Sequence, residues 1–297
     1  MDMDYIVIGG GSGGSVIAGR LSENADVQVM LLEAGGQGDS WLVNTPAAAV
    51  AMLPTRINNY AFETVPQAGL NGRKGYQPRG KGLGGSSAIN AMVYTRGHRS
   101  DYDHWSELGN AGWSYEELLP YFKRSENNSR IQNEFHGHDG PMHVSDLQSN
   151  NPFQQIYLNA AREAGFPVND DFNGASQEGL GIYQVTQRNG ERWSAARGYL
   201  HPYMGKRPNL HVETGVQVTR IVFVGNRAVG VECIQSGHKR LIRARREVIL
   251  CVGAFQSPQL LMVSGVGPGA HLQQHGIKVL HKCTAVRHAL SDRKSVV

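Results

Sequence analysis

The feature that most constrains this chain is a glycine-rich turn near its N-terminus, between a short apolar segment and a helical pattern. Residues 5–8 read Tyr-Ile-Val-Ile, a run typical of a buried strand. Gly9, Gly11 and Gly14 follow in G-x-G-x-x-G spacing. We expect the first glycine to permit a tight turn, the second to let a pyrophosphate approach the backbone, and the third to let a helix pack closely on the strand. The pattern predicts a dinucleotide whose pyrophosphate lies at the helix N-terminus.

A second apolar run and an acidic residue complete this pattern. Residues 27–32 are mostly apolar and end on Glu33, 19 residues after Gly14. A carboxylate here can accept hydrogen bonds from ribose hydroxyls and would repel a 2′-phosphate, which argues against NADP. The order of strand, turn, helix, strand and acid favours a dinucleotide site over a flexible glycine loop, but it does not separate FAD from NAD. We include Ser12 and Ala34 in the predicted site.

The composition excludes several classes of protein. The chain has 297 residues, of which 40% are hydrophobic and 18% charged, as in an ordinary soluble globular protein with one large domain or two smaller ones. No apolar run approaches the roughly 20 residues of a membrane-spanning helix. Residues 1–4 are acidic and lack the layout of a signal peptide. We therefore expect a cytoplasmic protein.

Charge and cysteine spacing argue against nucleic acid and zinc. Residues 276–297 carry five lysines or arginines and one acid, whereas the rest of the chain holds 24 charges of each sign. A neutral body gives no support for nucleic-acid binding. Cys233, Cys251 and Cys283 are odd in number and show no C-x-x-C spacing, which indicates a reducing compartment and no zinc site. We interpret His136 and His138 as part of a polar surface loop rather than as metal ligands.

Periodicity and capping signals predict several further elements. Residues 210–252 alternate apolar and polar side chains, with turn signals at 225–226 and 236–237, and predict a β-meander that leads into a buried strand at 248–252. The predicted helices are residues 114–124 with Ser114 as N-cap, residues 152–164 before Gly165, and a helix that begins at Ser257-Pro258 and ends at Gly265.

Two long segments carry a resemblance to a known family. Residues 80–90 read Gly-Lys-Gly-Leu-Gly-Gly-Ser-Ser-Ala-Ile-Asn, and residues 253–267 read Gly-Ala-Phe-Gln-Ser-Pro-Gln-Leu-Leu-Met-Val-Ser-Gly-Val-Gly. Together with the N-terminal fingerprint they resemble the glucose–methanol–choline (GMC) family of FAD-dependent oxidoreductases. The resemblance covers residues 3 to about 280. Residues 91–103 and 183–200 resemble the bacterial alcohol and choline dehydrogenase branch.

The resemblance implies an α/β fold and FAD as the cofactor. The fold would be a Rossmann-like FAD-binding domain with a β-meander, plus part of an α+β substrate-binding domain. Arg79 or Lys81 could offset the phosphate charge. Ile89 stands where some relatives carry the histidine that tethers the flavin, so we expect non-covalent FAD. The residues implied as flavin contacts are Gly84, Asn90, Ala91, Met92 and Val93, and Val218 is implied as an adenine contact.

Family members are nearly twice as long as this chain, so we expect an N-terminal portion. The expected domains are residues 1–130 and 206–280 for the two parts of the FAD-binding domain and 131–205 for part of the substrate-binding domain. The likeness is expected to end near His281, and we interpret residues 281–297 as a tail foreign to the family, from a frameshift or assembly artefact rather than divergence.

The resemblance also implies a reaction and its partners. The full-length protein would oxidise a primary alcohol, aliphatic or choline-like, to the aldehyde by hydride transfer to flavin N5. Electrons would pass to a quinone or other acceptor, which is compatible with peripheral association at the inner face of a membrane. The catalytic histidine base lies in the C-terminal half, so we expect no catalytic residue here. The alternatives are a fold relative of the hydroxynitrile lyases and an inactive truncated product.

Overall fold

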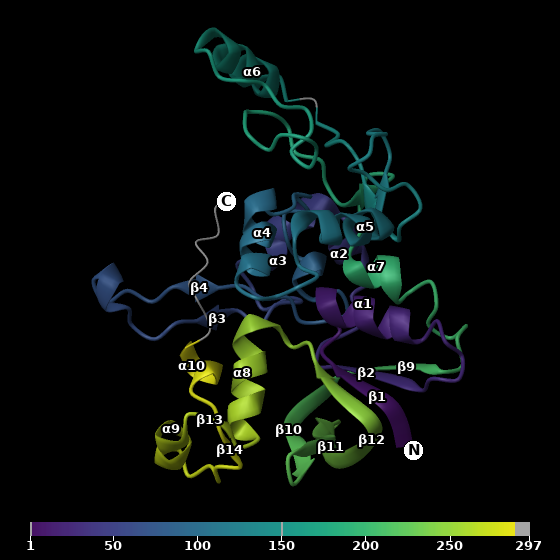
Figure 1. Cartoon of the computed structure of the whole chain (residues 1–297), viewed down its shortest axis with the longest axis vertical. Helices are drawn as coiled ribbons and strands as arrows, with labels where there is room; N and C mark the ends of the chain where they lie inside the picture. The colour runs from purple at the N-terminus through teal and green to yellow at the C-terminus, as the bar shows by residue number, and fades with distance from the viewer. Residues whose placement is uncertain (1, 150, 289–297) are drawn as a thin grey trace. The chain divides into compact units, whose positions relative to one another are not determined.

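The computed structural model describes residues 2–149 and 151–288, which divide into two compact units (Figure 1). The first unit contains residues 1–40, 50–89 and 195–297, and the second contains residues 41–49 and 90–194. The domain boundaries expected from the sequence for the whole protein remain a prediction. None of the described helices is long and apolar enough to span a membrane.

The first unit is built on a mixed six-stranded sheet in the order β10-β11-β12-β1-β2-β9. β1 pairs in parallel with β12 and β2, and β2 pairs in parallel with β9. The predicted α/β class and the meander are therefore confirmed. The strands are β1 (Asp2–Ile8), β2 (Val29–Glu33), β9 (Leu210–Thr214), β10 (Val216–Val224), β11 (Arg227–Gln235) and β12 (His238–Leu250).

The expected meander differs from the observed one at both ends. Residues 210–214 do not belong to it, because β9 lies at the opposite edge of the sheet beside β2. β12 is one continuous strand, whose first half pairs with β11 and whose second half pairs with β1. The expected buried strand at 248–252 is the end of β12, but it stops at Leu250 and its last three residues are half-buried rather than buried. A single long strand thus joins the antiparallel meander to the parallel sheet.

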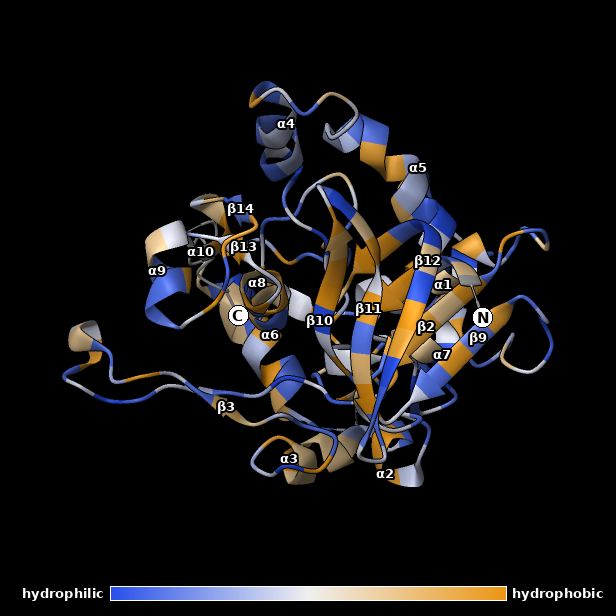
Figure 2. Ribbon diagram, turned by 90° about the horizontal axis from the view of Figure 1, so that it is seen from below, coloured by the Kyte–Doolittle hydropathy of each residue, from blue (hydrophilic) through white to orange (hydrophobic). Residues whose placement is uncertain are grey.

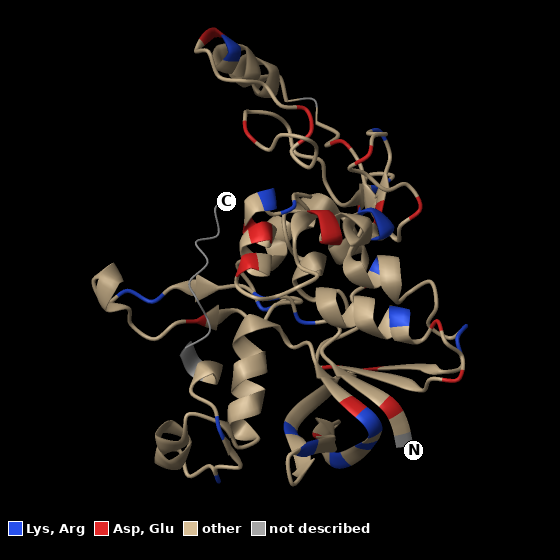
Figure 3. Cartoon of the chain, in the orientation of Figure 1, with Lys and Arg blue, Asp and Glu red and all other residues tan. Residues whose placement is uncertain are grey.

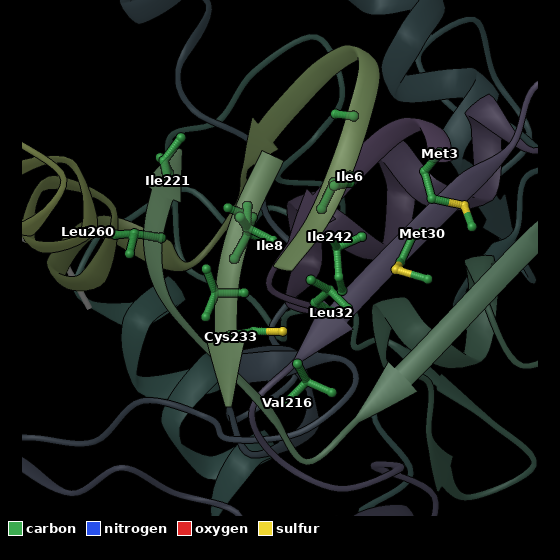
Figure 4. Packing of buried hydrophobic residues seen from close by; sticks show 13 residues of the cluster. Met3, Ile6, Ile8, Met30, Leu32, Val216, Ile221, Cys233, Ile242 and Leu260 are labelled. Carbon is green, nitrogen blue, oxygen red and sulfur yellow. The ribbon is translucent and has the colours of Figure 1, made fainter. Parts of the chain in front are cut away.

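Apolar side chains cover both faces of β1 and β2, as parallel strands require. All five residues of β2 are buried. Because side chains alternate along a strand, Ile6 and Ile8 join one core cluster while Val7 joins the other. Figure 4 shows the first cluster, in which Ile6 and Ile8 pack with Cys233 and Ile242 of the meander. Figure 2 shows the alternation of apolar and polar residues along β10, β11 and β12.

Helix α8 (Gly253–Val263) begins earlier than the sequence predicts. The expected start at Ser257-Pro258 is wrong, because the helix begins at Gly253, directly after β12, and Pro258 lies inside it. Proline lacks a backbone N–H and is therefore common in the first turn of a helix. In α8 the proline lies beyond the first turn, so its position does not mark the start of the helix. The predicted end is confirmed, since Gly265 follows the helix with a φ of +93°.

Both predicted helices of the second unit are present. α5 (Tyr115–Ser125) begins at a capping box, in which the Ser114 hydroxyl and the Glu117 carboxylate each accept a backbone N–H of the other residue. α6 (Phe153–Glu163) ends before Gly165 as expected. The unit also contains α2 (Trp41–Asn44), η1 (Pro46–Ala48), α4 (Arg99–Glu107), β5 (Glu126–Asn128), β6 (Met142–Val144), β7 (Gln187–Arg188) and β8 (Glu191–Arg192).

The remaining elements of the first unit are short. Lys282, in β14, pairs with Gly267 of β13, and the Cys283 N–H donates to the Gly267 carbonyl at 2.9 Å. Residues 281–288, which the sequence analysis assigns to a foreign tail, thus contain ordered elements that pair with the rest of the unit, while 289–297 lie outside the described residues. The elements are α1 (Ser12–Leu21), β3 (Phe62–Glu63), η2 (Ala68–Leu70), β4 (Tyr76–Gln77), η3 (Gly85–Ala88), α7 (Ala195–Tyr199), β13 (Val266–Gly267), α9 (Gly269–Gln274), β14 (His281–Lys282) and α10 (Ala285–His288), with α3 (Ala49–Met52) at the unit boundary.

Basic side chains gather on the meander strand β12 (Figure 3). Several of them have carboxylate partners. Arg240 pairs with Glu213 at 2.6 Å. Arg245 and Arg246 share Asp4, at 3.2 and 3.3 Å. The pKa of Asp4 is lowered, first by the hydrogen bond from the Gln28 backbone N–H and then by these two arginines, against the opposing effect of burial.

A buried ionic network holds the second unit together around His136. The expectation of a surface loop is wrong for this residue, which is 1% exposed, whereas His138 is exposed. His136 Nδ1 lies 2.7 Å from Glu126 Oε1, and its Nε2 lies 3.0 Å from Asp171 Oδ1. Arg96 pairs with the second oxygen of Glu126 at 2.6 Å. Among the described residues, no group of His, Cys, Asp and Glu side chains is arranged to hold a metal ion.

The network makes stability depend on pH. Burial by itself lowers the pKa of His136, but its hydrogen bonds to Asp171 and Glu126 outweigh burial and raise the pKa from 6.5 to about 9. The folded state therefore binds a proton that the unfolded state releases. This stabilisation is complete below pH 6.5 and is lost as the pH rises through about 9.

We predict that His136→Gln removes this pH dependence. The variant should be destabilised at pH 6.5, by on the order of 3 kcal/mol for a pKa shift of this size, and progressively less as the pH rises toward 9. Urea unfolding at several pH values measures the difference. His138→Gln, on the exposed neighbour, is the matched control and should follow the unchanged chain. Equal destabilisation by His136→Gln at pH 6.5 and pH 9 would contradict the prediction.

Candidate functional site

A cavity of about 270 Å³ opens in the first unit where β1 and β2 end. In open α/β sheets, ligands bind outside the carboxyl ends of the parallel strands. The first turns of α1 and α8 also reach this cavity. Its lining residues are Ile8, Gly9, Gly11–Gly13, Leu32–Ala34, Tyr60, Phe62, Arg79, Gly80, Gly85, Ser86, Val216–Val218 and Cys251–Gln256.

The three glycines of the fingerprint differ in their surroundings. Gly9 has a φ of +93°, and a Cβ atom there would lie 2.7 Å from the Cys251 carbonyl oxygen. A Cβ on Gly14 would lie 1.9 Å from the Gly9 oxygen. A Cβ on Gly11 would meet no atom closer than Gly85 Cα at 3.9 Å. Gly9 and Gly14 are therefore required by packing, whereas Gly11 leaves space in the cavity itself.

Glu33 joins three glycine-rich segments. The residue is 5% exposed. Its Oε2 accepts the Gly10 N–H at 2.8 Å, and its Oε1 accepts the N–H groups of Gly35 at 2.8 Å and Gly82 at 3.0 Å. Each carboxylate oxygen can accept two hydrogen bonds, so Glu33 keeps capacity for a ligand hydroxyl. The role toward ribose remains a prediction, and the bonds to the loops are a second role that the spacing did not indicate.

The second glycine-rich loop packs directly on the first. The Gly84 N–H donates to the Gly10 carbonyl at 2.7 Å. A Cβ on Gly85 would lie 2.7 Å from Gly11 Cα, and one on Gly80 would lie 2.0 Å from the Gly85 oxygen. Only glycine permits this backbone approach. Residues some 70 positions apart in the chain thus form one wall of the cavity.

The structure brings half of the predicted site residues together. Gly14 and Gly84 hold the loops in place behind the cavity surface. Residues 90–93 belong to the second unit, where the Met92 N–H donates to Asn90 Oδ1 at 3.1 Å. The role of Asn90, Ala91, Met92 and Val93 as flavin contacts remains a prediction. The predicted residues that line the cavity are Gly9, Gly11, Ser12, Glu33, Ala34 and Val218.

The cavity also has an aromatic part, which the sequence motifs do not indicate. Tyr60 and Phe62 stack with ring centroids 5.1 Å apart, and Phe255 meets Phe62 edge-on at 6.2 Å. Burial, followed by the charge of Glu33, raises the pKa of the Tyr60 hydroxyl. Tyr60 and Phe62 lie in and beside the two-residue strand β3, which is too short for a periodic pattern, and Phe255 lies in the first turn of α8, before the expected helix start.

Cys251 is not a candidate nucleophile, although it lines the cavity. Burial raises the pKa of its thiol. The reactive form of cysteine is the thiolate, so a raised pKa makes this residue inert at neutral pH. The lining therefore offers backbone N–H groups, one carboxylate, one arginine and aromatic rings, which suits binding rather than covalent chemistry.

Comparison with known proteins identifies the family. The GMC oxidoreductase family model matches residues 3–291. The match runs past His281, so the sequence analysis placed the end of the likeness too early. The chain is 46% identical over 297 residues to an oxygen-dependent choline dehydrogenase of Brucella anthropi, covering 100% of this chain and 54% of that protein. It is 44% identical to an alcohol dehydrogenase [acceptor] of Pseudomonas putida, covering 99% and 53%.

Solved structures agree with this relationship. Pyridoxine 4-oxidase from Mesorbium loti matches with a TM-score of 0.90 at 33% identity, over 95% of this chain and 55% of that one. An FAD-dependent oxidoreductase from Chaetomium thermophilum matches with a TM-score of 0.88 at 31% identity, over 96% and 51%. The chain spans about half the length of the curated relatives it matches. Because the family model matches almost all residues of the chain, the chain belongs to the GMC oxidoreductase family.

Proposed function

We propose that this chain forms the cofactor-binding part of an FAD-dependent alcohol dehydrogenase, and that the cavity of the first unit holds the ADP portion of FAD. The observation that carries the proposal is the cavity at the start of α1, where Gly11 leaves open space and the helix offers its first N–H groups. Glu33 would accept the ribose hydroxyls, and the backbone near Val218 would face the adenine.

The whole protein is proposed to oxidise a primary alcohol, aliphatic or choline-like, to the aldehyde. Bound FAD would supply the hydride acceptor, flavin N5. The choline and alcohol dehydrogenase names of the relatives support an alcohol as substrate. We propose a quinone-type electron acceptor, reached by peripheral association with a membrane. Residues 90–93 are proposed to contact the flavin.

The first prediction concerns the open space at Gly11. Gly11→Val should abolish flavin binding, because a Cβ at Gly11 lies in open space and the side chain would extend into the cavity. Gly69→Val is the matched control, since a Cβ at Gly69 meets nothing within 4 Å and lies outside the cavity. Flavin absorbance of the purified proteins, together with circular dichroism to confirm folding, measures the result. A folded Gly11→Val protein that retains full flavin would refute the assignment of the site.

The second prediction concerns how FAD is attached. Purified full-length protein should release all of its flavin on acid or heat treatment, because Ile89 has no nucleophilic group to form a bond with the flavin. The absorbance of the supernatant after precipitation measures the released fraction. Flavin that stays with the denatured protein would show a covalent link elsewhere in the chain.

The third prediction concerns activity. These 297 residues contain no counterpart of the histidine base that the family resemblance places in the C-terminal half. Loss of a general base costs about 10²- to 10⁴-fold in rate. We therefore expect the 297-residue chain to give no alcohol-dependent dye reduction above a no-protein control. Reduction well above that control would mean that a base is present within these residues.

A further inference from the structure

Of two basic residues that are only two positions apart in the sequence, one lines the cavity and the other does not. Arg79 is the only lysine or arginine among the described residues that line it. Lys81 is exposed, lies outside the lining, and has its Nζ 5.4 Å from the centre of the Tyr60 ring. Tertiary structure therefore distinguishes the two side chains, which the sequence analysis treated as equivalent.

Arg79 is held in place without a carboxylate partner. Its guanidinium carbon lies 4.6 Å from the centre of the Phe255 ring. Nη1 donates to the Pro78 carbonyl at 2.6 Å, and the backbone N–H donates to Asn59 Oδ1 at 2.9 Å. No ion pair to Arg79 occurs within the described part of the chain. A guanidinium has five N–H donors, so this one retains both its charge and free donors for a ligand.

Two helix N-termini add to the positive character of the same cavity. Gly11–Gly13 at the start of α1 and Gly253–Gln256 at the start of α8 both line it. Each first turn has backbone N–H groups without intrahelical partners and carries a partial positive charge. Glu33 is the single acid among the described lining residues, and its oxygens already accept three N–H groups. The cavity as a whole therefore favours an anionic ligand group.

We propose that Arg79, stacked on Phe255, is the cation that binds the diphosphate of FAD in this cavity. The inference rests on the proposed function, because it assigns a residue to the cofactor of that function. Arginine suits the role since its planar guanidinium can stack on a ring and donate two parallel hydrogen bonds to phosphate oxygens. Phe255 fixes the guanidinium plane, so less side-chain freedom is lost when the ligand binds.

The test is a fluorescence titration of the 297-residue chain with FAD at several salt concentrations. Arg79→Met should weaken FAD binding by about tenfold to a hundredfold, the range of a hydrogen bond to a charged group. It should also flatten the dependence of log Kd on log salt concentration. Lys81→Met, the charge-matched control, should change Kd by less than about twofold. Phe255→Leu should keep the salt dependence and weaken binding by less than Arg79→Met does.

Several outcomes would overturn the inference. Unchanged binding by a folded Arg79→Met protein would show that Arg79 does not contact the ligand. Weaker binding with an unchanged salt dependence would show a purely structural role. Equal effects of Arg79→Met and Lys81→Met would show a diffuse charge effect. If Arg79→Met fails to fold by circular dichroism, Arg79→Lys should retain the salt dependence with a higher Kd. If the unchanged chain is folded but binds no FAD, the proposed function itself fails, and this inference with it.

Discussion

Close backbone contact between glycine-rich segments is the constraint on which the rest of the first unit depends. A Cβ on Gly85 would lie 2.7 Å from Gly11 Cα, and the Gly84 N–H donates to the Gly10 carbonyl at 2.7 Å. These contacts bring the N-terminal turn and the 80–88 loop together, and Glu33 then ties both to its own strand end through three backbone N–H groups. A carboxylate accepting charge-assisted hydrogen bonds is well suited to this task, because each bond is stronger than one between neutral groups.

The two units are stabilised by different interactions. The first has apolar clusters on both faces of β1 and β2, so its stability rests on the removal of apolar surface from water. The second surrounds His136 with Glu126 and Asp171, and pairs Arg96 with the same glutamate. Burying charges is costly unless each has a partner. Loss of one member therefore leaves a buried charge without its partner, and the titration of His136 makes the stability of this unit depend on pH.

The donors that the cavity offers to a charged ligand come mainly from the backbone. Its positive character comes from the first turns of α1 and α8 as well as from Arg79, while Cys251 stays protonated. Such fixed dipoles need no reorganisation when a ligand arrives. The chain spans about half the length of its relatives, and the catalytic groups of the proposed reaction are expected in the other half. Under the proposed function, this part of the fold recognises the cofactor.

The sequence by itself determined the features that depend on local spacing. The fingerprint predicted β1, α1, β2 and Glu33, the capping box predicted α5, and alternation predicted the meander. Tertiary structure decided which distant segments meet. It buried His136 between two carboxylates, placed Gly253–Gln256 at the cavity, and separated Arg79 from Lys81. The physical reason is that periodicity and capping act within one or two turns, whereas burial and electrostatic pairing depend on neighbours that the chain supplies from tens to hundreds of residues away.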